Sequence, residues 1–225
     1  MKGQDILLLL KLLSLAQPKE PYQLILRTEG WQGWKAQYDD DEAATSIEED
    51  FATRFVKTAD APTYDDFLRS RYSVRSLAES TGISKSQVSL SLQRSYESGL
   101  ARLDLRTGEP NVNAKLLCEF IVYGIRYVFP TKLGEVTRGI ATAMAAPVLR
   151  QQVMTAGELV PVWPHALGNT KGQAVEPLAS SVARAVRDDP LLYAMLALTD
   201  AIRIGLPREK NLATKLLAQL TGVDA

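Results

Sequence analysis

The side chains whose types and spacing allow chemistry in this sequence are short polar and basic groups between residues 75 and 107. They are Arg75, Ser84, Lys85, Ser86, Gln87, Ser89, Arg94, Arg106 and Thr107. A Gln amide can form two hydrogen bonds with adenine, and Ser and Lys side chains reach base edges or phosphates. Arg side chains hold phosphates, because the guanidinium is always charged. Such groups within one short segment are typical of a surface that binds DNA.

Two predicted helices position these groups. Leu77 and Ala78 lie on the first helix, and the small side chain of Ala78 lets the second helix cross closely. Gly82 supplies the left-handed backbone that a tight turn requires. Ser84 then caps the second helix, 84–97, because its hydroxyl accepts a free backbone N–H. The residues expected to face inward are Ile83, Val88 and Leu92.

A two-stranded hairpin is predicted directly after the second helix. Gly99 ends that helix, and apolar and charged residues alternate from Ala101 to Leu105, as in a half-buried strand. The turn cluster 106–110 follows, and 111–113 forms the return strand. Two helices joined by a short turn containing Gly are typical of a helix-turn-helix, whose second helix enters the major groove.

The segment 73–115 resembles the DNA-binding core of bacterial winged helix-turn-helix regulators of the MarR-like kind. The matching positions are Leu77, Ala78, Gly82, Ile83, Ser84, Val88, Leu92, Gly99 and Leu100, with the wing tip at 106–110. Ser95 departs from the pattern, since such families usually carry Leu there. The resemblance implies that the protein binds double-stranded DNA as a homodimer, with apolar terminal helices forming the dimer.

The charge is unevenly distributed along the chain, although its formal total is zero. Residues 69–115 carry eight Lys or Arg against four Asp or Glu, an excess of four positive charges. Residues 39–66 carry ten acidic residues against two basic ones, an excess of eight negative charges. The positive segment coincides with the predicted helix-turn-helix, as contacts with phosphates require.

Composition and motifs argue against an enzyme and against a bound cofactor. The single cysteine, Cys118, excludes an intrachain disulfide and favours a reducing, cytoplasmic compartment. The lone His165 has no Cys or His neighbours, so it predicts neither a metal site nor a catalytic dyad. The sequence contains no phosphate-binding P-loop and no dinucleotide-binding glycine motif.

The Leu-rich residues 1–16 allow two interpretations, an export signal or a buried first helix. Asp5 and Lys11 interrupt the apolar run, and the run is too short to span a membrane. We therefore favour a helix packed on the helix-turn-helix. The residues expected on its inward stripe are Ile6, Leu9, Leu10 and Leu13.

Residues 17–71 are predicted to be an insertion after this helix. They include a hairpin at 22–38, a short amphipathic helix around 47–55 and a helical turn at 65–70. Trp31 and Trp34 either cover the hairpin, which we favour, or form a patch for a partner. The acidic run 39–42 is either a solvated face or a clamp for a basic protein partner.

The rest of the chain is predicted to be mostly helical. Helix 114–128 is apolar on nearly every side, which indicates burial in a core or in a subunit interface. Within the irregular part, 131–177, we predict a short helix at 147–155 and a hairpin that pairs 159–163 with 172–175. Further helices are expected at 178–187, 190–205 and after Pro207, with Asp189 as an N-cap and with an Asp200–Arg203 pair.

The predicted fold class is therefore mainly α with a small β wing (α+β). Residues 1–130 form the winged helix-turn-helix domain with the insertion, and 131–225 form a mostly helical region for dimerisation or partner binding. The predicted function is a sequence-specific DNA-binding transcriptional regulator without membrane attachment. The alternative is an antitoxin-like or adaptor protein that binds a protein partner through the acidic insertion and the C-terminal region, while it regulates its own operon.

Overall fold

The structure, a computed structural model, describes residues 1–17, 63–150 and 159–223. These residues form a mixed α and β fold in which 57% of the described residues are helical and the sheets are small. Most of the predicted insertion lies outside the described residues. The hairpin at 22–38, the helix at 47–55, the tryptophan patch and the acidic run therefore stay predictions. The one described helix of that segment is α4 (Tyr64–Ser70), which Thr63 caps by accepting the Asp66 N–H.

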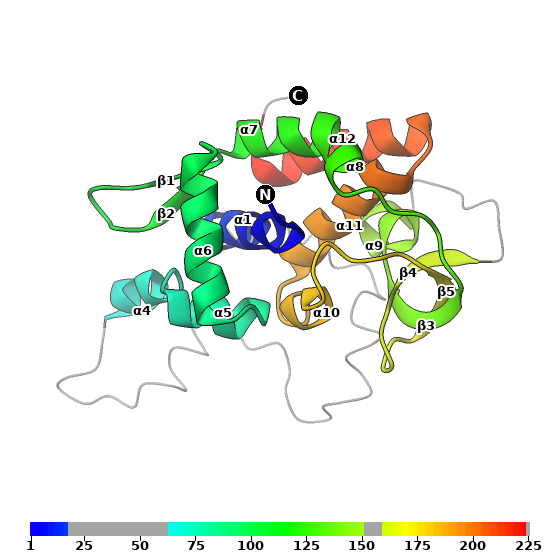
Figure 1. Cartoon of the computed structure of the whole chain (residues 1–225), viewed down its shortest axis with the longest axis horizontal. Helices are drawn as coiled ribbons and strands as arrows, with labels where there is room; N and C mark the ends of the chain where they lie inside the picture. Colours follow the sequence, from blue (N-terminus) through cyan, green and yellow to red (C-terminus); the bar gives the residue numbers. More distant parts are fainter. Residues whose placement is uncertain (18–62, 151–158, 224–225) are drawn as a thin grey trace.

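Helix α1 (Gly3–Ala16) lies at the centre of the molecule (Figure 1). Every side chain from Asp5 to Ser14 is buried, which confirms the buried first helix. Burial extends around the whole helix rather than along the predicted stripe. The reason is that α1 packs against α6 on one side and against α11 on another. A helix surrounded in this way needs apolar residues at nearly every position.

The helix-turn-helix segment contains α5 (Val74–Thr81), α6 (Lys85–Glu97), β1 (Ala101–Leu103) and β2 (Pro110–Val112). Gly82 ends α5 with a φ of 70°, and the Ser84 hydroxyl accepts the backbone N–H of Gln87 at the start of α6. β1 and β2 pair antiparallel, with Arg102 opposite Asn111. The predicted order of helix, turn, helix and hairpin is therefore present in this segment.

The next helical segment is less buried than its composition predicts. It consists of α7 (Ala114–Glu119), a π-helical turn η1 (Phe120–Gly124) and α8 (Ile125–Val128). Leu117, Cys118, Ile121 and Ile125 are buried, but several apolar side chains on the other side are exposed. The core of this chain covers one face of the segment, and burial of the other face in a subunit interface stays a prediction.

Three short strands form a closed barrel in the region that the sequence predicts to be irregular. They are β3 (Val136–Ala141), β4 (Val160–Pro164) and β5 (Thr170–Ala174). β3 pairs antiparallel with both other strands, whereas β4 and β5 pair parallel. The predicted hairpin between 159–163 and 172–175 was therefore wrong in direction. β4 and β5 both run antiparallel to β3, so they point in the same direction.

Glycines allow this small barrel to close. A Cβ atom at Gly139 would meet the Trp163 carbonyl oxygen, and one at Gly172 would meet that of Val160. A Cβ at Gly168 would meet the backbone of Gly139. Because side chains at these positions would collide with main chain, only glycine permits the strands to approach so closely.

The C-terminal part contains the 3-10 turn η2 (Ala143–Ala145), α9 (Pro147–Arg150), α10 (Val182–Ala185), α11 (Pro190–Ile204) and α12 (Pro207–Thr221). α10 is shorter than the helix predicted at 178–187. The predicted N-cap of α11 is confirmed, because the Asp189 carboxylate accepts the Leu192 N–H at 2.9 Å. The Asp200–Arg203 pair is also confirmed, with an N–O distance of 2.6 Å. One hydrophobic cluster extends from Ile6 to Leu220, across the predicted domain boundary at residue 130.

Candidate nucleic-acid interface

The first half of α6 presents short polar side chains to solvent. Ser84, Lys85, Ser86 and Ser89 are all exposed, whereas Val88 and Leu92 are buried against the core. The helical period produces this division, because Val88 and Leu92 are four residues apart and share the inward face, whereas Lys85, Ser86 and Ser89 lie off that face. Four of the predicted site residues thus share one accessible surface at the start of a helix.

The electrostatics of this surface favour a negatively charged ligand. α6 has no acidic residue in its first turn, and Lys85 is its first residue. A helix N-terminus carries a partial positive charge and leaves backbone N–H groups without partners inside the helix. Phosphate groups bind well at such positions, so Lys85 and the helix end both attract a negatively charged group.

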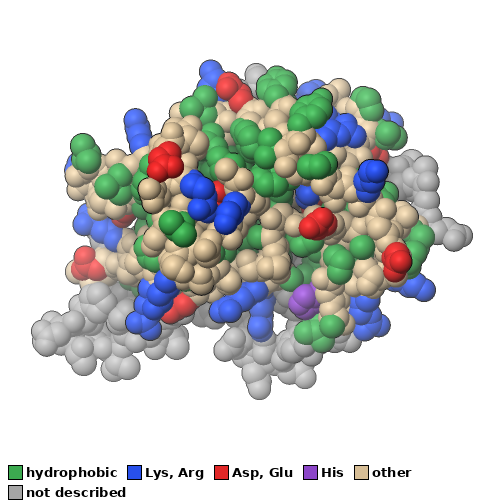
Figure 2. Space-filling model, in the orientation of Figure 1, with side chains coloured by type: hydrophobic (Ala, Val, Ile, Leu, Met, Phe, Trp, Pro, Cys, Tyr) green, Lys and Arg blue, Asp and Glu red, His purple; other side chains and the backbone are tan. Residues whose placement is uncertain are grey.

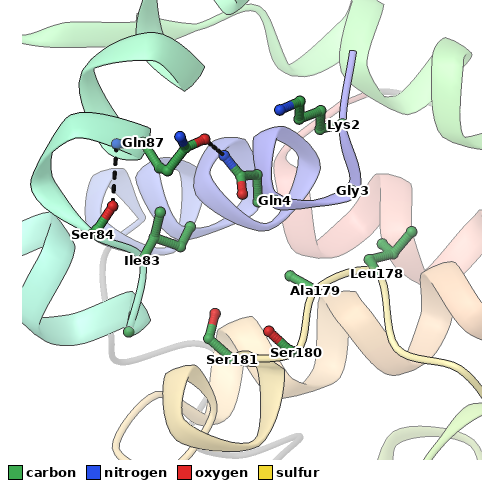
Figure 3. Close-up of a pocket in the computed structure, with 11 residues that line it drawn as sticks. Lys2, Gly3, Gln4, Ile83, Ser84, Gln87, Leu178, Ala179, Ser180 and Ser181 are labelled. Atoms are coloured by element: carbon green, nitrogen blue, oxygen red, sulfur yellow. Dashed lines mark hydrogen bonds between the residues drawn. The ribbon is translucent and has the colours of Figure 1, made fainter.

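Gln87 is held away from this surface. Its Oε1 accepts a hydrogen bond from Gln4 Nε2 of α1 at 2.9 Å, and the residue is half-buried. Figure 3 shows the side chains of Gln4 and Gln87 directed toward one another. Because this bond occupies the carbonyl oxygen that an adenine contact would use, the predicted base contact by Gln87 is not supported, and we remove Gln87 from the interface.

A cleft of about 310 Å³ lies beside this pair, between the start of α1, the turn before α6 and the loop before α10. The residues that line it are Lys2, Gly3, Gln4, Gly82, Ile83, Ser84, Gln87, Leu178, Ala179, Ser180 and Ser181 (Figure 3). Its walls are mainly polar, and the sequence gives no signal for it because its three segments are far apart in the chain.

The sequence predicts that Arg94 contacts a DNA phosphate, but in the structure its side chain is already paired. Its guanidinium donates to both carboxylate oxygens of the buried Asp5, at 2.9 and 2.6 Å. The hydroxyl of Ser91 donates to the same carboxylate at 2.6 Å. Burial alone would raise the pKa of Asp5, but the hydrogen bonds from Arg94, Ser91 and the Lys2 amide outweigh it and lower that pKa. Arg94 therefore neutralises a core carboxylate.

The position where the sequence departs from the family pattern has a local explanation. Ser95 is fully buried, and its hydroxyl donates to the Ser91 carbonyl oxygen at 2.8 Å. Ser91 is buried as well. The inner face of α6 therefore combines small hydroxyl side chains with the Asp5–Arg94 pair, where an apolar helix would carry Leu.

Arg75 is exposed on α5 and forms an ion pair with Glu79 one helical turn later, at 3.0 Å. Both side chains are more than half exposed, at 76% and 62%. An exposed pair of this type is worth little free energy, so a phosphate can replace Glu79 as the partner of Arg75. Arg75 therefore stays in the candidate interface.

The hairpin contributes an exposed arginine at its turn. Asp104 accepts the backbone N–H groups of Arg106 and Thr107, and these bonds lower the pKa of its carboxyl. The Thr107 hydroxyl accepts the Glu109 N–H, so it stabilises the turn. The Arg106 side chain is exposed, and so is that of Arg102 on β1, which the sequence analysis did not select. The alternation from 101 to 105 could have identified Arg102.

Basic side chains lie on the surface around α6 and the β1–β2 hairpin, with acidic side chains between them (Figure 2). The exposed basic residues of α5, α6 and the hairpin turn include Arg75, Lys85, Arg102 and Arg106. We define the α6–hairpin surface by these four residues together with Ser84, Ser86 and Ser89. A ligand with repeated negative charges matches its chemistry.

Other kinds of site find little support in the part of the chain that the structure describes. No group of three or more His, Cys, Asp or Glu residues there could hold a metal ion. No described helix is both long and apolar enough to cross a membrane. Cys118 is buried and shares a hydrogen bond with Thr221, and burial raises the pKa of its thiol. A thiol in this environment is unreactive.

Comparison of the chain with protein-family models, with curated proteins and with solved structures finds no match.

Proposed function

We propose that this protein is a sequence-specific DNA-binding regulator of the winged helix-turn-helix type. In this proposal α6 enters the major groove and the β1–β2 hairpin acts as the wing along the phosphate backbone. The observation that carries the proposal is the exposed, capped and acid-free first turn of α6, with Lys85 at its start.

Base recognition is assigned to the side chains that project from this turn. Lys85 can bind guanine, and Ser86 and Ser89 can donate to or accept from base edges. Backbone positioning is assigned to Arg75, Arg102 and Arg106, because phosphate contacts fix the register of a protein on DNA. This division predicts that changes in α6 relax the sequence preference, whereas changes at the arginines weaken binding to every sequence.

The experiment is a gel-shift assay with duplex DNA from upstream of the protein's own gene. The test variant is Lys85→Ala combined with Ser89→Ala. Both side chains are exposed, so the fold is retained, and we expect specific binding to fall by at least about tenfold. The matched control is Lys215→Ala on α12, which removes an exposed lysine elsewhere.

Two results would count against the proposal. Equal affinity of the α6 variant and the wild type would remove α6 from the interface. An equal loss in Lys215→Ala would show that net charge, rather than the α6 surface, determines binding. Circular dichroism of each variant confirms that the helices are intact.

A further inference from the structure

The segment formed by α7, η1 and α8 carries an unusual exposed surface. We define the aromatic face by Leu116, Phe120, Tyr123, Tyr127 and Val128. Tyr123 is 74% exposed and Tyr127 is 82% exposed, and Leu116 and Val128 are each more than 40% exposed. Figure 2 shows hydrophobic side chains gathered over α7 and α8 at the top of the view. Single exposed apolar residues are ordinary, whereas a row of them along one helix marks an interaction surface.

The opposite side of the same segment explains why this face is oriented outward. Leu117, Ile121 and Ile125 are fully buried, so they fix the rotation of the segment against the core. The π-helical turn widens the helix at its centre, where the Ile125 N–H donates to the Phe120 carbonyl oxygen. Turns of this kind occur often at functional positions. The exposure of both tyrosines is therefore fixed by the core.

The charged residues beside the aromatic face are complementary to a second copy of the same face. Glu119 and Arg126 are both exposed, and neither forms an ion pair within the described residues. Glu119 lies four residues before Tyr123, and Arg126 lies three residues after it. If two copies of the segment pack antiparallel about a two-fold axis near Tyr123, Glu119 of each copy approaches Arg126 of the other. One symmetric contact thus forms two pairs of opposite charge.

We infer that the aromatic face is an interface with a second copy of this chain, packed antiparallel about Tyr123. Tyr and Arg are enriched at the energetic centres of protein interfaces, and the face contributes two tyrosines with Arg126 beside them. This inference differs from the dimer through terminal helices that the family resemblance implies. It also stands independently of DNA binding, so the two proposals can fail separately.

The first experiment is sedimentation velocity of the full chain without DNA, at concentrations from ~1 to ~100 µM, where dimers of moderate affinity dissociate. We expect a dimer that Tyr123→Ser and Tyr127→Ser each weaken by at least about tenfold, as interface tyrosines do. Both side chains are mostly exposed, so their truncation spares the fold. The matched control is Leu105→Ser, which truncates a 94% exposed side chain on the hairpin and leaves the dimer unchanged.

The second experiment reverses the charges. Glu119→Arg and Arg126→Glu each place like charges opposite one another, so each weakens the dimer by about tenfold. The double variant restores the opposite charges and recovers wild-type dimerisation to within about threefold. Rescue requires that the two residues meet across the interface, because seven positions separate them along their own helix.

Several outcomes would overturn the inference. They are a monomer at every concentration, a dimer that the tyrosine variants do not weaken, or charge reversals without rescue. Binding to lipid vesicles that Tyr123→Ser and Tyr127→Ser abolish would instead assign the face to a membrane surface. A monomer that still binds its DNA specifically would overturn this inference alone, whereas a dimer without DNA binding would overturn the proposed function alone.

Discussion

Two buried ion pairs connect α1 to helices far away in the sequence. Asp5 pairs with Arg94 of α6, and Lys11 pairs at 2.8 Å with Asp189, the N-cap of α11. Ser14 donates to the same Asp189 carboxylate at 2.6 Å. Charges in a core must be paired and hydrogen-bonded. The charges that interrupt the apolar run of residues 1–16 therefore fix how the two halves of the molecule pack on α1.

Removing one partner of such a pair should be costly. Arg94→Ala leaves the Asp5 carboxylate buried without its cation, and we expect the free energy of unfolding to fall by about 3 kcal/mol. Arg75→Ala is the control, since its exposed pair with Glu79 is worth less than about 1 kcal/mol. Urea denaturation at pH 7 measures both variants. Equal losses in the two variants would show that the Asp5–Arg94 pair is not a core element.

The lowered pKa of Asp5 makes stability depend on pH. The unfolded carboxyl, with a pKa near 3.8, takes up a proton before the folded one. Stability from Asp5 is therefore complete above about pH 5 and is lost as the pH falls toward the lower folded pKa. We expect Asp5→Asn to be less stable at pH 7 and to lose less stability than the wild type on acidification to pH 3.

Urea denaturation over a pH series, compared between Asp5→Asn and the wild type, tests this dependence. Asp200 changes the pH dependence of stability in the opposite direction, because burial raises its pKa despite the neighbouring Arg203. The comparison cancels that contribution, which both proteins share. Parallel pH profiles for the two proteins would contradict the assigned role of Asp5.

At the scale of elements, local signals predicted the helix-turn-helix segment well. Gly82, Ser84 and Gly99 each determine a backbone conformation through short-range chemistry, and the structure has the helix ends there. The β3–β5 barrel could not be predicted in this way. Its parallel β4–β5 pair depends on both strands pairing with β3, and its glycines resemble ordinary loop residues in the sequence.

Gly139 offers a test of the barrel. Gly139→Ala places a Cβ against the Trp163 carbonyl group, and we expect a loss of about 3 kcal/mol or more in unfolding free energy. Gly134→Ala is the control, because the nearest atom to its Cβ is 3.4 Å away, an ordinary contact. Thermal unfolding measures both. A Gly139→Ala variant as stable as Gly134→Ala would contradict the strand approach described for β3 and β4.

The predicted site illustrates the same limit. Spacing along α6 correctly selected Ser84, Lys85, Ser86 and Ser89 as exposed, since helical period alone determines their direction. It could not reveal that Gln87 bonds to Gln4 or that Arg94 bonds to Asp5. Those partners lie more than 80 positions away in the chain, so only the packing of α1 brings them together.

At the scale of the whole molecule, the core is continuous. α1 contacts both the helix-turn-helix segment and α11, and α10 contacts α5. The two regions predicted from the sequence, 1–130 and 131–225, therefore share one hydrophobic cluster. We expect one cooperative unfolding transition, with coincident curves from tryptophan fluorescence and far-ultraviolet circular dichroism. Two separated transitions would show that the regions unfold independently.

The central claim, that the α6–hairpin surface reads DNA, is tested most directly by fluorescence anisotropy over a salt series. The protein is titrated into duplex DNA from upstream of its own gene and into a scrambled duplex of the same composition. We expect the native sequence to bind about a thousandfold more tightly, with an affinity that falls steeply as salt rises. Equal affinity for both duplexes, or no binding to either at low salt, would contradict the claim.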